Sequence, residues 1–184
     1  EFTKDIAYLS EIGYPALLSM SKFLSKTLKP TKNGLLLVAP SASPEQKHMG
    51  ENYISKGTTF DQGLVWETYN DLIKASKIIG TNDDFINTVR NQINKLDPII
   101  IGASGQIKEF REEEKYGDIG DPKHRHVSHL CPIYPGTLIN SNKPTWTEAV
   151  SKVLDLRGNK TTGWAMAHRM NIRARTKEAE KAHE

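Results

Sequence analysis

Hydrophobic residues recur along much of the chain at intervals of three or four, the spacing that places them on one face of an α-helix. This pattern predicts helices over residues 4–28, 61–79 and 83–96. Pro15 lies inside the first of these segments. It should kink or split that helix, because proline lacks the amide hydrogen that a helix interior needs.

Local signals mark where several helices should begin. Thr81 or Asn82 is expected to cap the helix over 83–96, since both side chains accept hydrogen bonds from a first helical turn. Thr145-Trp-Thr-Glu148 has the spacing of a capping box and should open another helix. A final helix is predicted to begin near Thr162.

Extended segments are few. Only residues 35–39 and 106–110 have the pattern of short strands. Residues 98–142 are rich in Gly and Pro but also contain Ile, Phe, Tyr and His, which favours a structured functional loop over disorder. The chain is therefore predicted to be all-α, with long functional loops on one side.

Composition and charge exclude several classes of protein. Lys and Arg number 25 against 22 Asp and Glu, and the net charge of +3, without a basic cluster, indicates neither a nucleic acid nor a membrane surface as partner. The longest apolar run, residues 35–40, is far shorter than the roughly 20 residues of a spanning helix. The single Cys131 excludes an internal disulfide and a CxxC motif. Both ends fall in helix-like sequence, so we expect a segment of a larger domain.

Two carboxylates are candidates for acid–base chemistry. Glu45 follows Pro40 and Pro44 in a stiff loop, and such a loop can hold an acid in apolar surroundings, where it stays protonated and can donate a proton. A surface residue at a turn is the commoner interpretation of this pattern. Glu67 lies inside the predicted helix beside Trp66, where a solvated or hydrogen-bonded helix residue is the simpler alternative.

The densest polar cluster of the sequence spans residues 118–130. His124, His126 and His129 lie there within six residues, together with Arg125. Imidazole and guanidinium donors in a loop suit the recognition of sugar hydroxyls or of a carboxylate. A zinc site that includes Cys131 is a rival interpretation, although the spacing matches no common zinc motif. Histidines that merely tie the loop together are a third.

Trp164 follows the glycine-containing connection that starts at Arg157 and lies near a helix start. Its indole ring is a candidate platform for stacking a sugar, and thus for substrate binding. A plain hydrophobic anchor is the commoner use of such a residue.

Taken in order, these segments resemble the catalytic domain of the glycoside hydrolase family 95 enzymes, the inverting α-L-fucosidases with some α-L-galactosidases. The most specific match is HRHVSHL at 124–130 followed by YPG at 134–136, and PSASPE at 40–45 comes next. The similarity covers nearly the whole chain. The other matching segments are Tyr14–Leu17, Thr58–Ser76 with its WETY, Ile101-Gly with Gly105–Ile107, Arg157–Asn159 and Thr162–Trp164.

This resemblance implies both a fold and an activity. Residues 1–184 would be a fragment of one (α/α)6 toroid, in which helical hairpins form two rings and their loops line a substrate pocket. Glu45 would be the general acid, Arg125 and His126 would bind the fucose, and Glu67 would brace the site. The implied partner is a fucosylated oligosaccharide or glycan, no cofactor is expected, and the location would be periplasmic or extracellular.

The resemblance also implies what the chain does not supply. The family's water is held by asparagines upstream of this sequence and polarised by an aspartate beyond its end, so we expect the chain alone to be inactive. Gln46 stands where the family commonly has Asn, and His168-Arg169 where a Trp-Lys pair is expected. These departures leave the choice between fucose and galactose open.

Two other functions stay open, and the oligomeric state is not predicted. One is a non-catalytic carbohydrate-binding protein; the other is a helical protein that binds metal through His124, His126 and His129. The hydrolase interpretation makes one spatial prediction: Glu45 and Arg125 should face the same sugar-sized hollow.

Overall fold

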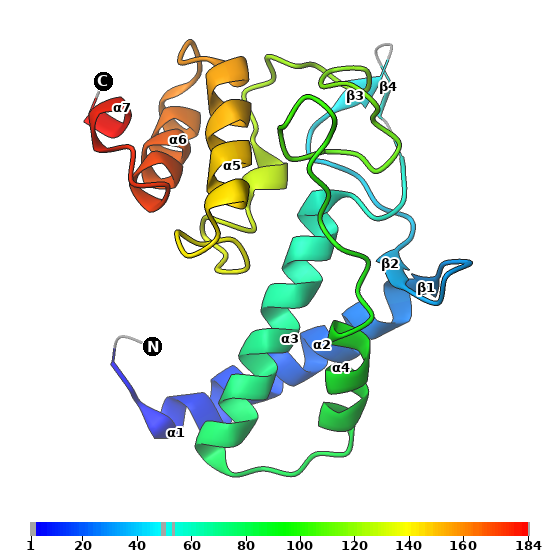
Figure 1. Ribbon diagram of the computed structural model, residues 1–184. Helices are drawn as coiled ribbons and strands as arrows, with labels where there is room; N and C mark the ends of the chain where they lie inside the picture. Colours follow the sequence, from blue (N-terminus) through cyan, green and yellow to red (C-terminus); the bar gives the residue numbers. More distant parts are fainter. Residues whose placement is uncertain (1–2, 49–50, 53, 184) are drawn as a thin grey trace. The chain divides into compact units, whose positions relative to one another are not determined.

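The computed structural model of the protein describes residues 3–48, 51–52 and 54–183 (Figure 1). Helices dominate the described residues, and the sheets among them are two ribbons of two short strands each. The helix-rich character expected from the sequence is therefore confirmed. The closed toroid implied by the resemblance stays a prediction.

Two compact units make up the chain. The first comprises residues 1–37 and 65–97, and the second comprises residues 38–64 and 98–184. The long helix α3 (Thr59–Ile79) begins in the second unit and ends in the first.

The first unit is built mainly from helices. Its elements are α1 (Ile6–Tyr8), the π-helical turn η1 (Leu9–Gly13), α2 (Tyr14–Thr27), β1 (Leu28–Pro30), the start of β2 (Leu36–Val38), most of α3, and α4 (Phe85–Ile93). The buried Tyr69 of α3 donates its hydroxyl to Gln92 Oε1 at 2.6 Å, and Gln92 Nε2 donates to Ser25 Oγ at 2.8 Å. These bonds connect α2, α3 and α4 around the apolar core of the unit.

The predicted interruption at Pro15 is confirmed. The Tyr14 N–H donates to Leu9 O, five residues back, and Pro15 occupies the first turn of α2. Proline has no N–H to continue the regular ladder, so a π-turn precedes it.

The predicted cap of the helix over 83–96 is wrong. The helix begins at Phe85, and the Phe85 N–H donates to Asp83 Oδ1 at 2.8 Å. The carboxylate next to the first turn, rather than Thr81 or Asn82, therefore satisfies a free amide there.

The second unit carries the conspicuous polar motifs. Its elements are the end of β2, the antiparallel pair β3 (Lys47–His48) and β4 (Glu51–Asn52), the first turns of α3, the 3-10 turn η2 (Ser128–Leu130), α5 (Pro144–Arg157), α6 (Gly163–Arg175) and α7 (Ala179–His183). The predicted strand over 35–39 is confirmed as β2. The one over 106–110 is reduced to a single bridge between Ile101 and Ile107.

The long segment before α5 belongs to the core of the second unit. Its buried apolar side chains pack with those of α5 and α6; the cluster includes Ile107, Val127, Leu130, Ile133, Val150, Val153, Leu154 and Ile172. The expected ordered loop is confirmed, because burial of these side chains fixes its course.

The two helix starts predicted near the C-terminal end have different outcomes. Helix α5 begins at Pro144, so Thr145 lies inside its first turn and no side-chain bond caps Lys143. The predicted capping box is therefore wrong, and proline starts the helix instead. Helix α6 begins at Gly163 with Thr162 in the N-cap position, as predicted.

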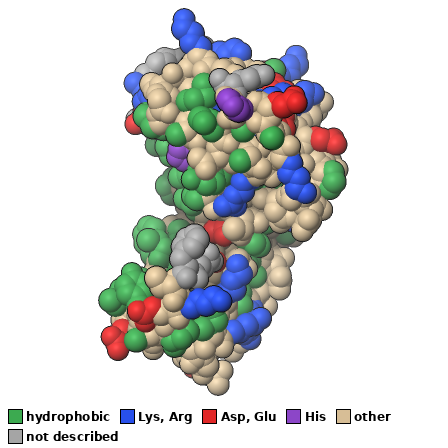
Figure 2. Space-filling view, turned by 90° about the vertical axis from the view of Figure 1, so that its left-hand side faces the viewer, with side chains coloured by type: hydrophobic (Ala, Val, Ile, Leu, Met, Phe, Trp, Pro, Cys, Tyr) green, Lys and Arg blue, Asp and Glu red, His purple; other side chains and the backbone are tan. Residues whose placement is uncertain are grey.

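Surface charge agrees with the sequence analysis. Lys and Arg side chains are dispersed among neutral surface on the face shown in Figure 2 and form no continuous patch there. Within the described residues, no helix has both the length and the apolar character needed to cross a bilayer.

Candidate active site

The loop that carries Glu45 is held at its base by hydroxyl groups. Ser41 Oγ donates to Asp61 Oδ2 at 2.6 Å and accepts from the Thr58 N–H at 3.0 Å. Ser128 Oγ, on the histidine-rich segment, donates to Pro44 O at 2.6 Å. The Glu45 loop and the histidine-rich segment are thus joined by a direct hydrogen bond one residue before Glu45.

Glu45 and Arg125 lie against each other. A guanidinium nitrogen of Arg125 donates to Glu45 Oε2, and His126 Nε2 lies 3.6 Å from the same oxygen. Glu45 and Arg125 also line one hollow with a volume of about 650 Å³, together with Lys47, Asp121 and His124. The spatial prediction from the sequence is therefore confirmed.

The surroundings of Glu45 differ from the sequence expectation. Its side chain is 60% exposed, and it lies against the Arg125 guanidinium and the His126 imidazole. The expected apolar environment is wrong, because the loop presents the carboxylate to a polar hollow and not to the hydrophobic core.

The two histidines beside this hollow are held towards their neutral forms. Burial lowers the pKa of His124, and the positive charges of His126 and Arg125 lower it further. Burial also lowers the pKa of His126, against the opposing effect of the Glu45 carboxylate. A neutral imidazole both donates and accepts hydrogen bonds, which suits contact with sugar hydroxyls.

Trp164 extends the site towards α6. Its ring and the His126 ring form a T-shaped contact, with centroids 4.9 Å apart and an interplanar angle of 87°. The Trp164 residue is 50% exposed. The structure therefore brings Trp164 together with Glu45, Arg125 and His126, all in the second unit.

Glu67 lies elsewhere in the chain. It is half-buried in the part of α3 that belongs to the first unit, whereas the other four candidates belong to the second. Its role in bracing the site stays a prediction.

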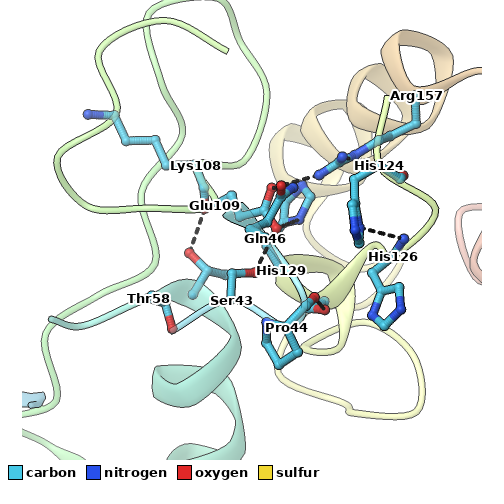
Figure 3. A network of polar contacts seen from close by, with 12 residues as sticks. Ser43, Pro44, Gln46, Thr58, Lys108, Glu109, His124, His126, His129 and Arg157 are labelled. Atoms are coloured by element: carbon cyan, nitrogen blue, oxygen red, sulfur yellow. Dashed lines mark hydrogen bonds and ion pairs between the residues drawn. The ribbon is translucent and has the colours of Figure 1, made fainter. Parts of the chain in front are cut away.

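A buried polar cluster lies next to the Glu45 loop (Figure 3). At its centre is Glu109, whose Oε1 accepts from Ser43 Oγ at 2.6 Å and whose Oε2 accepts from Gln46 Nε2 at 3.0 Å. Arg157, at the end of α5, donates to Glu109 Oε2 at 2.6 Å. The side chains of Glu109 and Arg157 are 4% and 0% exposed, so this ion pair is shielded from water.

Glu109 is ionised despite its burial. Burial alone would raise the pKa of its carboxyl, but the nearby His129 and Arg157 and the Ser43 hydroxyl outweigh burial and lower the pKa to about 2. His129 Nδ1 lies 3.6 Å from Glu109 Oε1, which is beyond hydrogen-bond distance.

Sequence reasoning missed the role of Glu109. The residue stands in the charged run KEFREEEK over 108–115, which has the appearance of a solvated face. Phe110 and Ile107, which are both fully buried, were the available signal that this run enters the core.

The metal interpretation of His124, His126 and His129 finds no geometric support. Over the described ranges, no three His, Cys, Asp or Glu side chains converge as ligands of one ion. His129 faces the buried Glu109, while His126 faces Glu45 at the hollow.

Comparison with known proteins shows that a protein with this helical framework and polar hollow belongs to the glycoside hydrolases. The chain belongs to glycosyl hydrolase family 95: the profile of the family's catalytic domain matches residues 1–184.

Curated relatives agree with this assignment. "Alpha-L-fucosidase 2" of Arabidopsis thaliana is 36% identical over 192 residues, which cover 99% of this chain and 22% of the relative. "Probable alpha-fucosidase A" of Aspergillus niger is 34% identical over 183 residues, covering 92% of this chain and 22% of the relative. The chain thus spans 22% of the length of these relatives.

Proposed function

We propose that this chain supplies the proton donor and part of the sugar-binding surface of an inverting α-L-fucosidase, which removes terminal α-linked L-fucose from glycans. The observation that carries the proposal is the contact of Glu45 with Arg125 and His126, beside the hollow that Glu45 and Arg125 line. Membership of family 95 and the α-fucosidase names of the relatives support the choice of substrate.

Glu45 is the general acid in this proposal. Its carboxyl gives a proton to the glycosidic oxygen while the bond from that oxygen to the anomeric carbon breaks, and the electron pair of the bond goes to the leaving oxygen. Arg125 contacts Glu45 directly, so substrate binding separates the two side chains. Arg125 then donates to a sugar oxygen and Glu45 faces the scissile bond.

His126 and Trp164 hold the sugar in this proposal. The neutral imidazole of His126 can hydrogen-bond a hydroxyl, and its contact with Trp164 fixes the two rings relative to each other. The half-exposed indole offers an apolar face on which a sugar ring, or the residue linked to it, can stack.

The other half of the reaction needs a water on the opposite face of the sugar, at a distance from the acid that leaves room for it. The resemblance implies that asparagine side chains hold this water and that an aspartate polarises it. Those groups take the proton of the water as the new bond to the anomeric carbon forms.

The proposal is tested with the natural polypeptide that carries these residues. It should hydrolyse an α-L-fucoside, and proton NMR during the first turnovers should show the β-anomer of L-fucose, as inversion demands. The rate on a matched α-L-galactoside would measure the preference between fucose and galactose, which the sequence leaves open. Binding of fucose without turnover would support the carbohydrate-binding alternative and overturn the proposal.

A further inference from the structure

A single buried carboxylate contacts both residues that flank the Pro44-Glu45 segment. Glu109 Oε1 accepts from Ser43, which precedes the segment, and Glu109 Oε2 accepts from Gln46, which follows it. Both flanking side chains are buried, whereas Glu45 itself is exposed. The acid is therefore carried on a short arch whose two ends are fixed to the same side chain.

The opposite wall of the hollow is connected to the same carboxylate. Arg157 donates to Glu109 through Nη2, and through Nη1 to Asp121 O at 2.7 Å and His124 O at 3.4 Å. Asp121 and His124 precede Arg125 in the segment that faces Glu45. The Glu109–Arg157 pair thus connects the backbone on both sides of the Glu45–Arg125 contact.

Gln46 strengthens this connection. Its amide oxygen accepts from the Asp121 N–H at 2.8 Å, and its amide nitrogen donates to Asp121 O at 3.3 Å as well as to Glu109. The Gln46 amide therefore pairs with both the N–H and the C=O of Asp121, as the backbone of a neighbouring strand would. The Gln46 side chain is long enough to make all three bonds.

A buried ion pair is a weak source of net stability, because removing two charges from water offsets most of their attraction. Such a pair can instead fix geometry. A carboxylate that accepts three directional hydrogen bonds restricts the positions of the groups that donate them. Here two of those donors belong to the arch that carries Glu45.

We propose that Glu109 is a positioning residue for proton donation, which holds the Glu45 arch at a set distance from the segment that carries Arg125 and His126. This inference rests on the proposed function of Glu45. It predicts that loss of the Glu109 contacts impairs proton transfer more than it impairs binding of the sugar.

The dependence of activity on the leaving group distinguishes a displaced acid from a lower fraction of folded protein. Departure of a poor leaving group, such as the sugar of a fucosyl disaccharide, needs a proton, whereas fluoride leaves α-L-fucosyl fluoride with far less help from the acid. A variant that only lowers the folded fraction loses activity on both substrates equally. A variant with a displaced acid loses activity on the disaccharide selectively.

The experiment compares Glu109→Gln with Glu113→Gln in the natural polypeptide. Glu113 is also a buried carboxylate of this segment, but it accepts from the Glu109 and Gly117 N–H groups, and within the described part of the chain it makes no hydrogen bond to the arch. The ratio of kcat/KM on disaccharide to kcat/KM on fluoride should fall about tenfold for Glu109→Gln, with little change in KM. For Glu113→Gln it should change less than about twofold.

Ser43→Ala is the second variant, since it removes one contact with the arch and leaves the Glu109–Arg157 pair in place. It should lower the same ratio about threefold. Equal losses on both substrates for Glu109→Gln and Ser43→Ala would overturn the inference. If the ratio also stays unchanged in Glu45→Gln, the proposed function fails as well, so the two failures are distinguishable.

Discussion

The carboxylate of Glu45 and the guanidinium of Arg125 are in contact although 80 positions separate them in the chain. Two hydrogen-bonded connections bring their segments together: Ser128 to Pro44 O, and Gln46 to the backbone of Asp121. These hydrogen bonds hold the two side chains close to each other. Attraction between two exposed charges alone is weak in water.

Glu45→Gln should abolish proton donation while preserving shape. We expect kcat on a fucosyl disaccharide to fall by about a hundredfold or more, because general acid catalysis contributes about 10²–10⁴ in rate. The loss on fucosyl fluoride should be much smaller. The matched control is Glu114→Gln, an exposed carboxylate on another loop, which should leave both rates unchanged. Disaccharide hydrolysis by Glu45→Gln at the wild-type rate would assign the acid to another residue.

Arg157→Met should destabilise the fold strongly. The substitution leaves the buried Glu109 without its cation, and breaking a buried pair in this way costs about 3–5 kcal/mol. Urea unfolding monitored by circular dichroism measures the change. Arg90→Met, at an exposed position of α4, should cost less than about 1 kcal/mol. Equal losses in the two variants would contradict a structural role for the Glu109–Arg157 pair.

Stability should decrease as the pH falls from about 5 towards 2. Burial opposes ionisation of Glu109, yet His129 and Arg157 lower its pKa to about 2, below the ordinary value of 4.5. A carboxyl with a lowered folded-state pKa stabilises the fold above its unfolded pKa, and this contribution disappears as it is protonated. Its size is on the order of 3 kcal/mol. Urea unfolding across this range should show a steeper decline for the wild type than for Glu109→Gln; parallel declines would refute the assignment.

Gly120→Ala should disturb Gln46. Gly120 has a φ of +76°, and a Cβ there would lie 2.6 Å from Gln46 Oε1. Gly34→Ala is a matched control, because Gly34 has a φ of +77° with nothing within 4 Å of the added Cβ. Both variants bear the cost of a left-handed residue, about 1–2 kcal/mol. Only Gly120→Ala should lose additional stability and reduce the preference for the disaccharide over the fluoride. Identical behaviour of the two would mean that Gln46 moves aside freely.

Helices were predictable because their signal is local. The three- and four-residue spacing located α2, α3 and α4, and Pro15 predicted an interruption, which the structure shows to be a π-turn before α2. The starts of α4 and α5 were harder to predict from the sequence, since several neighbouring polar residues can satisfy the same free amides. The short ribbon of β3 and β4 carries no periodic pattern and was not predicted.

The candidate site was predictable only in part. The pattern of polar residues indicated Arg125 and His126 as binding candidates and left metal binding and loop structure open, whereas Glu45 had a commoner interpretation as a surface residue until the motif resemblance was considered. The polar environment of Glu45 and the burial of Glu109 depend on partners more than 60 positions away, such as Ser43 and Gln46. Local sequence cannot distinguish such a buried carboxylate from the solvated members of the same charged run.

Binding of L-fucose to Arg125→Ala and to Glu45→Gln is the most direct test of a shared sugar site. Isothermal titration of the natural polypeptide should show that Arg125→Ala loses the sugar, while Glu45→Gln binds it about as well as the wild type but does not turn over disaccharide. Unchanged circular dichroism would verify that both variants fold. Wild-type affinity in Arg125→Ala would contradict the account, because the sugar would then lie away from the hollow that Glu45 and Arg125 line.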